Sequence, residues 1–228
     1  MIGTAARTLA VAAAAVGGTF FVSSSRSNRL PDSLPRAEVD ARLASTAGKD
    51  TAVFAGGCFW GIDAVFKHVK GVINVTSGYA GGTVPHPSYE DVSTSTTGHA
   101  ESVRVIYDPS QVTYAQLLQV FFSVHDPTEL NRQGPDVGTQ YRSAVFYRND
   151  DQKRLAEAYI AQLSKEKVFK RPIVTEVTKL NNFYAAEAYH QNYFAEHPYQ
   201  PYIVVNDAPK VAHVKSAFPA LYREVAAQ

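Results

Sequence analysis

The sequence predicts an α+β fold, a two-layer sandwich with a ferredoxin-like split β-α-β core (an α/β roll) and further elements at its C-terminal end. The main observation is the order of the expected elements from residue 50 onward, which reads β-α-β-β-α-β. Glycine, proline and helix-capping residues separate these elements at regular intervals. Of the 228 residues, 45% are hydrophobic and 19% are charged, which suffices for one domain with its own core.

The first β-α-β unit begins with a β-prone run over residues 51–55. This run leads into a helix expected over residues 59–70, and Gly71 stands where helices commonly end. A strand over residues 72–79 completes the unit, and a loop rich in glycine and proline follows it.

The second unit begins with a strand over Ala100–Tyr107, in which apolar and polar residues alternate. Thr113 and Gln116 form a capping-box pattern, which predicts a helix over residues 114–125. A strand over Ser143–Tyr147 closes the unit.

Two further elements are expected beyond this core. A helix over residues 150–167 places four apolar or aromatic residues on one face, namely Leu155, Ala158, Tyr159 and Leu163. A last strand over residues 174–178 precedes a tyrosine-rich C-terminal region.

The N-terminal 30 residues differ in composition from the rest. An apolar run over residues 8–22 follows Arg7, and no acidic residue occurs before Asp32. The run is shorter than the roughly 20 residues that a membrane span needs. It is typical of a secretory signal peptide or a marginal membrane anchor, with an organelle transit peptide as the alternative. We therefore expect export or anchoring, as in a periplasm, over an organelle or the cytoplasm.

The domain organisation follows from this composition. Residues 1–30 are expected to be the signal or anchor, residues 31–49 a linker, and residues 50–228 the folded domain. A short polar helix over residues 36–45 is expected within the linker.

Composition also excludes several classes of function. The formal net charge of +1 provides no electrostatic footprint for nucleic acid. A single cysteine excludes an intramolecular disulfide and a cysteine-based zinc site. Because no helical H-E-x-x-H pattern is present either, we expect no metal.

The single cysteine, Cys58, lies in the pentapeptide GCFWG, which also contains the single tryptophan. It stands where a strand is expected to turn into a helix. The free N–H groups and the dipole of a helix N-terminus favour a thiolate, which is the nucleophilic form. Phe59 and Trp60 would form an apolar wall beside it. The alternative is an inert cysteine that only packs in the core.

Four polar residues are candidates for acting with this thiol. Glu101 is the second residue of a strand that continues with Val103, Val105 and Ile106; in an apolar pocket it would stay protonated near neutral pH and could donate a proton. An exposed salt bridge is the alternative for Glu101. Tyr89 and Tyr141 lie in loops, where they would either pack or donate a hydrogen bond to a substrate oxygen. Asp136 is most simply a turn residue after proline.

Two other functions remain open from the residues alone. Cys58 could act with His99 or His190 as a cysteine hydrolase, although the expected order of residues and an oxyanion motif are missing. Alternatively, the domain could be a non-catalytic binding module with an inert thiol.

Several motifs occur in the same order as in one known family. They are GCFWG (57–61), GYAGG (78–82), PSY (87–89), TGHAE (97–101), DVGTQYRS (136–143), FYAAEAYHQ (183–191) and YF (193–194). Together they resemble the A-type peptide methionine sulfoxide reductases over about residues 53–202. The resemblance implies reduction of methionine S-sulfoxide, in proteins and as the free amino acid, without a metal or an organic cofactor.

The resemblance also implies a role for each matched residue. Cys58 would attack the sulfoxide sulfur and become a sulfenic acid, while Glu101 would protonate the sulfoxide oxygen. Tyr89 and Tyr141 would hydrogen-bond that oxygen, and Asp136 would help to shape the pocket. The two remaining matches would hold the substrate methyl group, namely Phe59 and Trp60.

The chain departs from many relatives at two positions. Ser93 stands where several relatives have a second cysteine, and His86 replaces an asparagine that is common before the PSY motif. Without a second cysteine, Cys58 must be regenerated from outside. The expected reductants are a thioredoxin-like dithiol, a glutaredoxin-like protein with a small thiol, or a dedicated exported reductant. A monomer is the expected state for this family.

Overall fold

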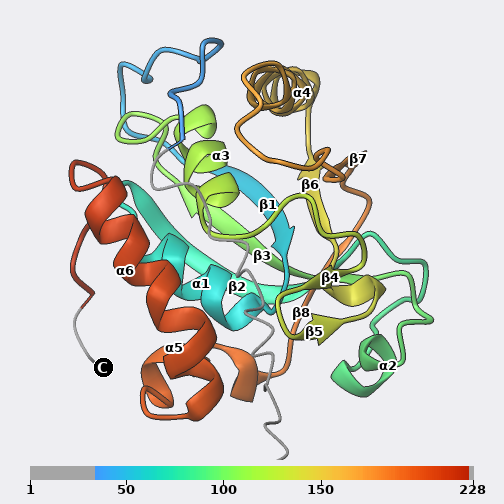
Figure 1. The fold of residues 1–228 in the computed structure, drawn as a ribbon. Coiled ribbons are helices and arrows are strands. Elements are labelled where there is room, and N and C mark those ends of the chain that lie inside the picture. The colour runs from blue at the N-terminus through green and yellow to red at the C-terminus, as the bar shows by residue number, and fades with distance from the viewer. Residues whose placement is uncertain (1–33, 226–228) are drawn as a thin grey trace, which may run out of the picture.

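The computed structural model describes residues 34–225, which form one mixed six-stranded sheet with helices packed against it (Figure 1). The strand order is β7-β6-β1-β3-β2-β8, and β4 and β5 form a separate pair. The strands of the sheet are β1 (Asp50–Gly56), β2 (Val72–Ala80), β3 (Ala100–Tyr107), β6 (Ser143–Tyr147), β7 (Glu176–Lys179) and β8 (Phe183–Ala185). The pair consists of β4 (Arg132–Gln133) and β5 (Asp136–Val137).

The four central strands confirm the predicted α+β fold. They lie in the order β6-β1-β3-β2 with antiparallel neighbours, which is the split β-α-β arrangement. At the edges, β7 pairs in parallel with β6, and β8 pairs antiparallel with the end of β2.

Six α-helices and three short helical turns complete the described chain. The helices are α1 (Phe59–Lys67), α2 (Tyr89–Ser93), α3 (Tyr114–Ser123), α4 (Asp150–Lys165), α5 (Tyr193–Glu196) and α6 (Ala208–Ala217). The turns are η1 (Thr139–Tyr141), η2 (Ala188–His190) and the π-helical turn η3 (Ile203–Asp207).

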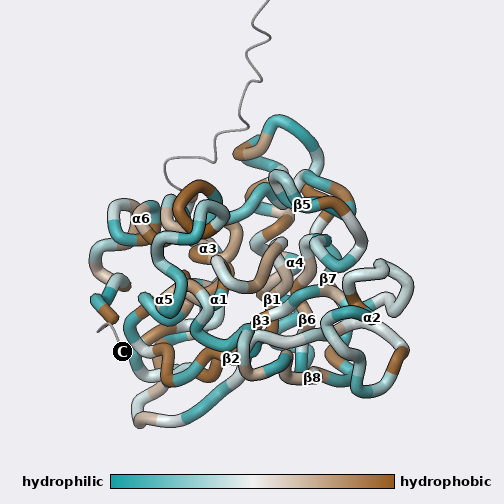
Figure 2. The backbone as a smooth tube through the Cα atoms, turned by 90° about the horizontal axis from the view of Figure 1, so that it is seen from below, coloured by the Kyte–Doolittle hydropathy of each residue, from teal (hydrophilic) through white to brown (hydrophobic). Residues whose placement is uncertain are grey.

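Alternation along β1 explains the two layers. Ala52 and Phe54 point into the main core, where they meet α1, α3 and α4, while Val53 and Ala55 belong to a smaller cluster on the other face. Phe54 stacks on Phe66 of α1 and on Phe121 of α3, with ring centroids 5.3 and 4.9 Å apart. Figure 2 shows the resulting pattern, in which short hydrophobic stretches alternate with hydrophilic ones along the chain.

The capping box predicted for α3 is confirmed. The Thr113 hydroxyl accepts a hydrogen bond from the backbone N–H of Gln116 at 3.1 Å, and the Gln116 side chain accepts one from the backbone N–H of Thr113 at 2.9 Å. The helix ends at Ser123, two residues before the predicted end.

Three other predicted boundaries differ from the structure. Helix α1 ends at Lys67 instead of residue 70, because the chain turns there and Val69 pairs with Tyr222 of the C-terminal segment. Helix α4 ends at Lys165 instead of residue 167, and the strand predicted over residues 174–178 lies at Glu176–Lys179.

The helix predicted over residues 36–45 is wrong, since this segment is not helical. Side chains of α4 bind its backbone instead: the Tyr159 hydroxyl donates to the carbonyl of Pro35, and the Gln162 amide donates to that of Arg36. These long-range bonds hold the segment against α4 and use carbonyls that a helix would need.

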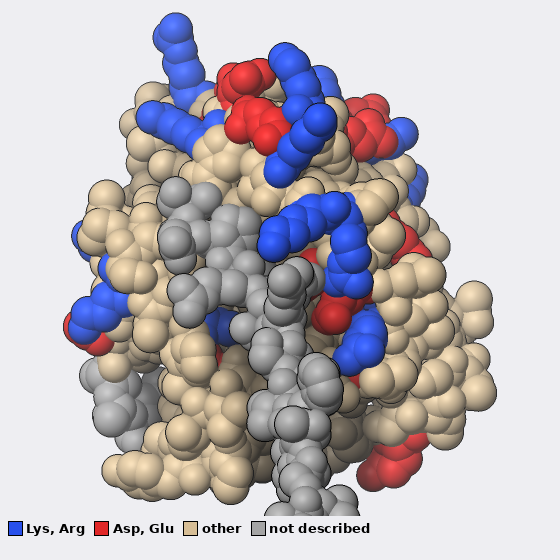
Figure 3. Space-filling view, viewed as in Figure 1, with Lys and Arg blue, Asp and Glu red and all other residues tan. Residues whose placement is uncertain are grey.

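The predicted signal or anchor over residues 1–30 lies outside the described residues. Among the helices of residues 34–225, none is both long and apolar enough to cross a membrane. Figure 3 shows Lys and Arg side chains interspersed with Asp and Glu at the top of one face, over α4, as the small net charge leads one to expect.

Candidate active site

Cys58 occupies the turn from β1 into α1, as predicted. It is the N-cap residue of α1 and is 7% exposed. The preceding Gly57 has a φ of +91°, and a Cβ there would come within 2.6 Å of Gln133 in β4. The first glycine of the motif therefore permits both the turn and the close approach of the β4–β5 hairpin.

The predicted stabilisation of the Cys58 thiolate is wrong for the resting site. Burial raises the pKa of the Cys58 thiol well above its usual value, and the carboxyls of Glu101 and Asp207 raise it further. The backbone N–H of Trp60 and the ammonium of Lys210 oppose this shift but do not outweigh it. The helix N-terminus does favour the thiolate, but desolvation is the larger effect, so Cys58 rests as a thiol.

Glu101 is a buried acid beside the same helix N-terminus. It lies in β3, is 3% exposed, and accepts a hydrogen bond from the backbone N–H of Phe59 at 3.0 Å. Burial raises its pKa to about 8, and the carboxyls of Asp136 and Asp207 contribute to the shift. Glu101 is therefore mainly a neutral acid at pH 7, the state expected for a carboxyl in an apolar pocket.

The two predicted tyrosines face this acid from different elements. Tyr89 opens α2 and Tyr141 ends η1, and both are half-buried. Burial raises the pKa of each phenol, and Glu101 and Cys58 are among the groups that raise it further. Both hydroxyls therefore remain protonated, so they are neutral hydrogen-bond donors beside Glu101 and the sulfur.

Asp136 is more than a turn residue, because it binds a tyrosine that the sequence did not single out. The hydroxyl of Tyr202 donates a hydrogen bond to the Asp136 carboxylate. Burial raises the pKa of Tyr202, and its interaction with Cys58 and its bond to Asp136 raise it further. This bond joins the β5 hairpin to the C-terminal segment across the site.

The aromatic wall beside Cys58 has one buried and one accessible member. Phe59 is buried, whereas Trp60 is half-buried. The Trp60 ring stacks on Tyr193 with centroids 3.8 Å apart, and its indole N–H donates to Nδ1 of His190 at 3.2 Å. The His190 ring also contacts Phe59 and Tyr89, with centroids 5.0 and 4.5 Å apart.

Neither candidate histidine supports a cysteine–histidine pair. His190 already uses Nδ1 for Trp60, and burial lowers its pKa, so it is neutral. His99 contacts the backbone of Gly82 and of Val84 instead. Within residues 34–225, no hydrogen bond joins either histidine to Cys58, and no cluster of His, Cys, Asp and Glu could hold a metal ion.

Two charged residues of the site were missed in the sequence. Asp207, at the end of η3, is fully buried and forms an ion pair with Lys210 of α6 at 2.9 Å. Both act on the electrostatics of Cys58. Their spacing of three residues on a helix was the available signal, but nothing local indicates that this pair would be buried beside the thiol.

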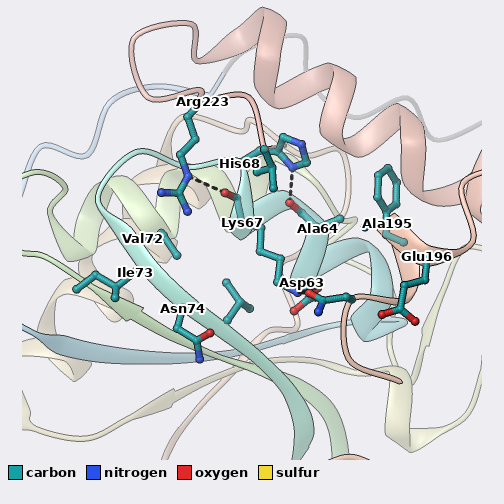
Figure 4. Close-up of a pocket in the computed structure, with 14 residues that line it drawn as sticks. Asp63, Ala64, Lys67, His68, Val72, Ile73, Asn74, Ala195, Glu196 and Arg223 are labelled. Atoms are coloured by element: carbon teal, nitrogen blue, oxygen red, sulfur yellow. Dashed lines mark hydrogen bonds and ion pairs between the residues drawn. The ribbon is translucent and has the colours of Figure 1, made fainter. Parts of the chain in front are cut away.

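A groove of about 530 Å³ lies at the other end of α1 (Figure 4). Its lining includes Asp63, Lys67, Asn74, Glu196 and Arg223. Its central charges are already paired, since Lys67 lies 2.6 Å from Asp63 and also contacts Asn192. The residues predicted to carry chemistry are all at the opposite end of the helix.

The comparison with known proteins agrees with this geometry. Residues 50–221 match the family of peptide methionine sulfoxide reductases. Peptide methionine sulfoxide reductase MsrA 2 of Mesorhizobium japonicum is 59% identical over 178 residues, which cover 78% of this chain and 91% of the relative. MsrA of Thermus thermophilus is 51% identical over 175 residues, which cover 77% of this chain and 98% of the relative.

Solved structures show the same fold. Methionine sulfoxide reductase A of Corynebacterium diphtheriae matches with a TM-score of 0.61 at 31% identity, covering 77% of this chain and 92% of that one. Reduced Mxr1 of Saccharomyces cerevisiae matches with a TM-score of 0.60 at 32% identity, covering 70% and 94%. The chain therefore belongs to the A-type peptide methionine sulfoxide reductases, enzymes with peptide-methionine (S)-S-oxide reductase activity.

Proposed function

We propose that this chain reduces methionine S-sulfoxide, in proteins and as the free amino acid, with Cys58 as the nucleophile. The observation that carries the proposal is the buried acid Glu101, which is bound to the first N–H of the helix that Cys58 opens. A sulfoxide sulfur is a poor electrophile until its oxygen is protonated. A neutral acid next to a thiol supplies that proton where it is needed.

Glu101 and Cys58 together account for the protons of the chemical step. Glu101 gives its proton to the sulfoxide oxygen as the Cys58 sulfur attacks the sulfoxide sulfur, and the resulting carboxylate accepts the proton of the thiol. The oxygen moves to Cys58 as a sulfenic acid, and methionine leaves. The two electrons that reduce the substrate come from the Cys58 sulfur. A thiol of raised pKa fits this sequence, because the thiolate is needed only once the substrate is present.

Neutral donors and an aromatic ring would orient the substrate. Tyr89 and Tyr141 carry protonated hydroxyls that interact electrostatically with Glu101 and Cys58, so they can bind the sulfoxide oxygen without adding charge. Asp136 would set the pocket through its bond to Tyr202. Trp60 would contact the methyl group of the substrate, and the buried Phe59 would support the wall behind it.

Regeneration of Cys58 needs an external thiol, since the chain has no second cysteine. One thiol forms a mixed disulfide with Cys58 and releases water, and a second thiol restores Cys58 and leaves as a disulfide. A thioredoxin-like dithiol, or a glutaredoxin-like protein with a small thiol, can perform both steps. No metal and no organic cofactor take part in these steps.

We further propose that the enzyme acts as an exported or membrane-anchored monomer. The apolar N-terminal run supports the location, and family resemblance supports the oligomeric state. Cell fractionation of the full chain and its mass in solution test the two statements separately.

A single-turnover experiment tests the proposed chemistry. The enzyme is mixed with excess methionine S-sulfoxide without reductant, and methionine is measured together with the mass of the Cys58 peptide. We expect about one methionine per chain and a sulfenic acid on Cys58, which dimedone traps. Methionine R-sulfoxide should give neither product. Retained turnover in Cys58→Ser would overturn the proposal.

A further inference from the structure

A second carboxylate, that of Asp207, is buried against the first turn of α1. Its side chain is 0% exposed and pairs with Lys210 at 2.9 Å. The pair lies directly on Gly61: a Cβ at this position would come within 2.2 Å of Asp207 Oδ1 and 2.9 Å of Lys210 Nζ. The second glycine of the GCFWG motif thus makes room for a charge pair one helical turn from Cys58.

This carboxylate is only partly satisfied. Asp207 Oδ1 bonds Lys210, but Asp207 Oδ2 is buried and has no hydrogen-bond partner among the described residues. A buried carboxylate oxygen without a partner destabilises a fold, and a well-packed apolar residue would avoid that cost. Asp63 Oδ1 is also buried without a partner, so this feature alone does not indicate a role in the site. The Asp207–Lys210 pair differs from the Asp63–Lys67 pair in its position on Gly61, in the first turn that follows Cys58.

The titratable groups that act on Cys58 come from several elements. They are Glu101 of β3, Tyr89 of α2, Tyr141 of η1, Tyr202 before η3, Asp207 of η3 and Lys210 of α6. Asp136 of β5 faces Glu101 and is bound by Tyr202. At pH 7 Glu101 is mainly neutral and the phenols are protonated. Within this set, Asp207 and Lys210 form the ion pair that acts on the sulfur; burial raises the pKa of Asp207, and the Lys210 ammonium opposes that shift.

We propose that the Asp207–Lys210 pair tunes the charge state of Cys58, with Asp207 adding to the effect of burial that keeps the resting sulfur a thiol and Lys210 limiting that addition. Both are positioning residues, since they act through Cys58. The benefit of keeping Cys58 as a thiol rests on the proposed function, in which Cys58 is the nucleophile. A thiol is oxidised more slowly than a thiolate, and overoxidation to sulfinic acid is generally irreversible. A chain with one cysteine has no second thiol that could trap the sulfenic acid first.

Alkylation of Cys58 by iodoacetamide, measured against pH, tests the pair directly. Cys58 is the only cysteine, so the reaction reports one site. Asp207→Asn leaves an unbalanced ammonium and should speed alkylation at pH 7.5 about tenfold, corresponding to a pKa lowered by about one unit. Lys210→Met removes the ammonium that opposes the raised pKa of Asp207, so alkylation should slow by a similar factor only at the alkaline end of the profile, where Asp207 is ionised. The double variant should return to within about threefold of the wild type.

The chain offers a matched control on the same helix. Asp63 and Lys67 also form an ion pair, at 2.6 Å, in which Asp63 is buried and Lys67 half-buried, and neither is among the groups that shift the pKa of Cys58. Asp63→Asn and Lys67→Met should therefore leave the alkylation profile unchanged while lowering thermal stability. Hydrogen peroxide provides a second readout: Asp207→Asn should reach sulfinic acid faster than the wild type.

Opposite changes in the Cys58 alkylation rate of the two single variants, which cancel in the double variant, support the proposal. A purely structural role would change both rates in the same direction. Equal shifts, or none, would overturn it, and so would an equal shift in the Asp63 control. Since alkylation requires no turnover, retained reductase activity in Cys58→Ser would defeat the proposed function without affecting this result.

Discussion

Helices α1 and α3 pack in the same core, but their first turns use their free N–H groups in opposite ways. Helix α3 caps itself, because Thr113 and Gln116 bind each other's backbone N–H groups. In α1 the Cys58 side chain makes no capping bond within the described chain, and the Phe59 N–H donates to Glu101 of a distant strand. The backbone N–H of Trp60 lowers the pKa of Cys58, against the larger effect of burial.

The first turn of α3 therefore serves only the stability of the helix, whereas the first turn of α1 also holds the residues of the candidate active site. The capping box of α3 is formed by two neutral side chains within one helical turn, so its own two bonds add stability without involving a charge, although the Thr113 hydroxyl also donates to Asp40. At α1 the same backbone groups serve a buried acid and a buried thiol, both with raised pKa values. Disruption of the α1 start should therefore change activity and pH dependence, whereas disruption of the α3 start should change stability alone.

The largest expected effect is on catalysis by Glu101→Gln. The amide keeps an acceptor for the Phe59 N–H but cannot donate an acidic proton, so kcat/KM should fall about 100- to 1,000-fold at pH 7. The wild-type rate should decline above pH 8 as Glu101 ionises, while the variant should lack this limb. A pH–rate profile with methionine S-sulfoxide and a thiol reductant measures both effects. A variant that retains the limb would exclude Glu101 as the acid.

The same substitution should stabilise the fold at alkaline pH. Folded Glu101 holds its proton up to a pKa of about 8, whereas the unfolded chain releases it near 4.5. The free energy of unfolding of the wild type therefore decreases as the pH rises from about 4.5 to about 8. Glu101→Gln removes this decrease. We expect the variant to gain a few kcal/mol over the wild type at pH 8.5 and little at pH 4. Urea unfolding at several pH values measures the difference. A pH-independent difference would place the carboxyl in a more polar environment.

Local patterns predicted the α3 start better than the α1 start. The capping box lies within four residues, so the spacing of Thr113 and Gln116 alone predicts it. Glu101 was recognisable as an acid on a strand that also carries Val103, Val105 and Ile106, and Cys58 as a thiol at a strand-to-helix turn. The bond between Phe59 and Glu101, however, forms only after β1 pairs with β3.

Long-range contacts also account for what the sequence left hidden. Asp207 lies in an ordinary stretch, IVVND, and becomes part of the site only because α6 packs on Gly61. In the sequence nothing distinguishes Tyr202 from the other tyrosines, of which the chain has 13. Only the fold brings its hydroxyl to Asp136. The pKa of Cys58 depends on burial, which opposes the helix dipole and is not visible in the local pattern.

A smaller effect is expected at the start of α3. Thr113→Val removes the capping hydroxyl and its bond to Asp40, which should cost about 1–2 kcal/mol and lower Tm by about 3–6 °C. The value of kcat/KM should stay unchanged, since no side chain of this cap faces Cys58. Melting curves and steady-state rates of the same preparation test both statements. A loss of activity beyond the fraction unfolded would contradict the separation of the two helix starts.

The smallest effect is expected in α2, which combines the two kinds of start. Ser88 and Asp91 form a capping box, while the N–H of Tyr89 donates to Glu187 at 2.8 Å. Ser88→Ala should lower Tm by about 1–3 °C. It should leave kcat/KM within about twofold, because Glu187 still holds the backbone of Tyr89. Glu187→Gln, with Ser88 intact, should impair turnover more. If Ser88→Ala lowered kcat/KM more than Glu187→Gln does, the local cap would orient the Tyr89 hydroxyl. A capping box would then contribute to activity as well as to stability.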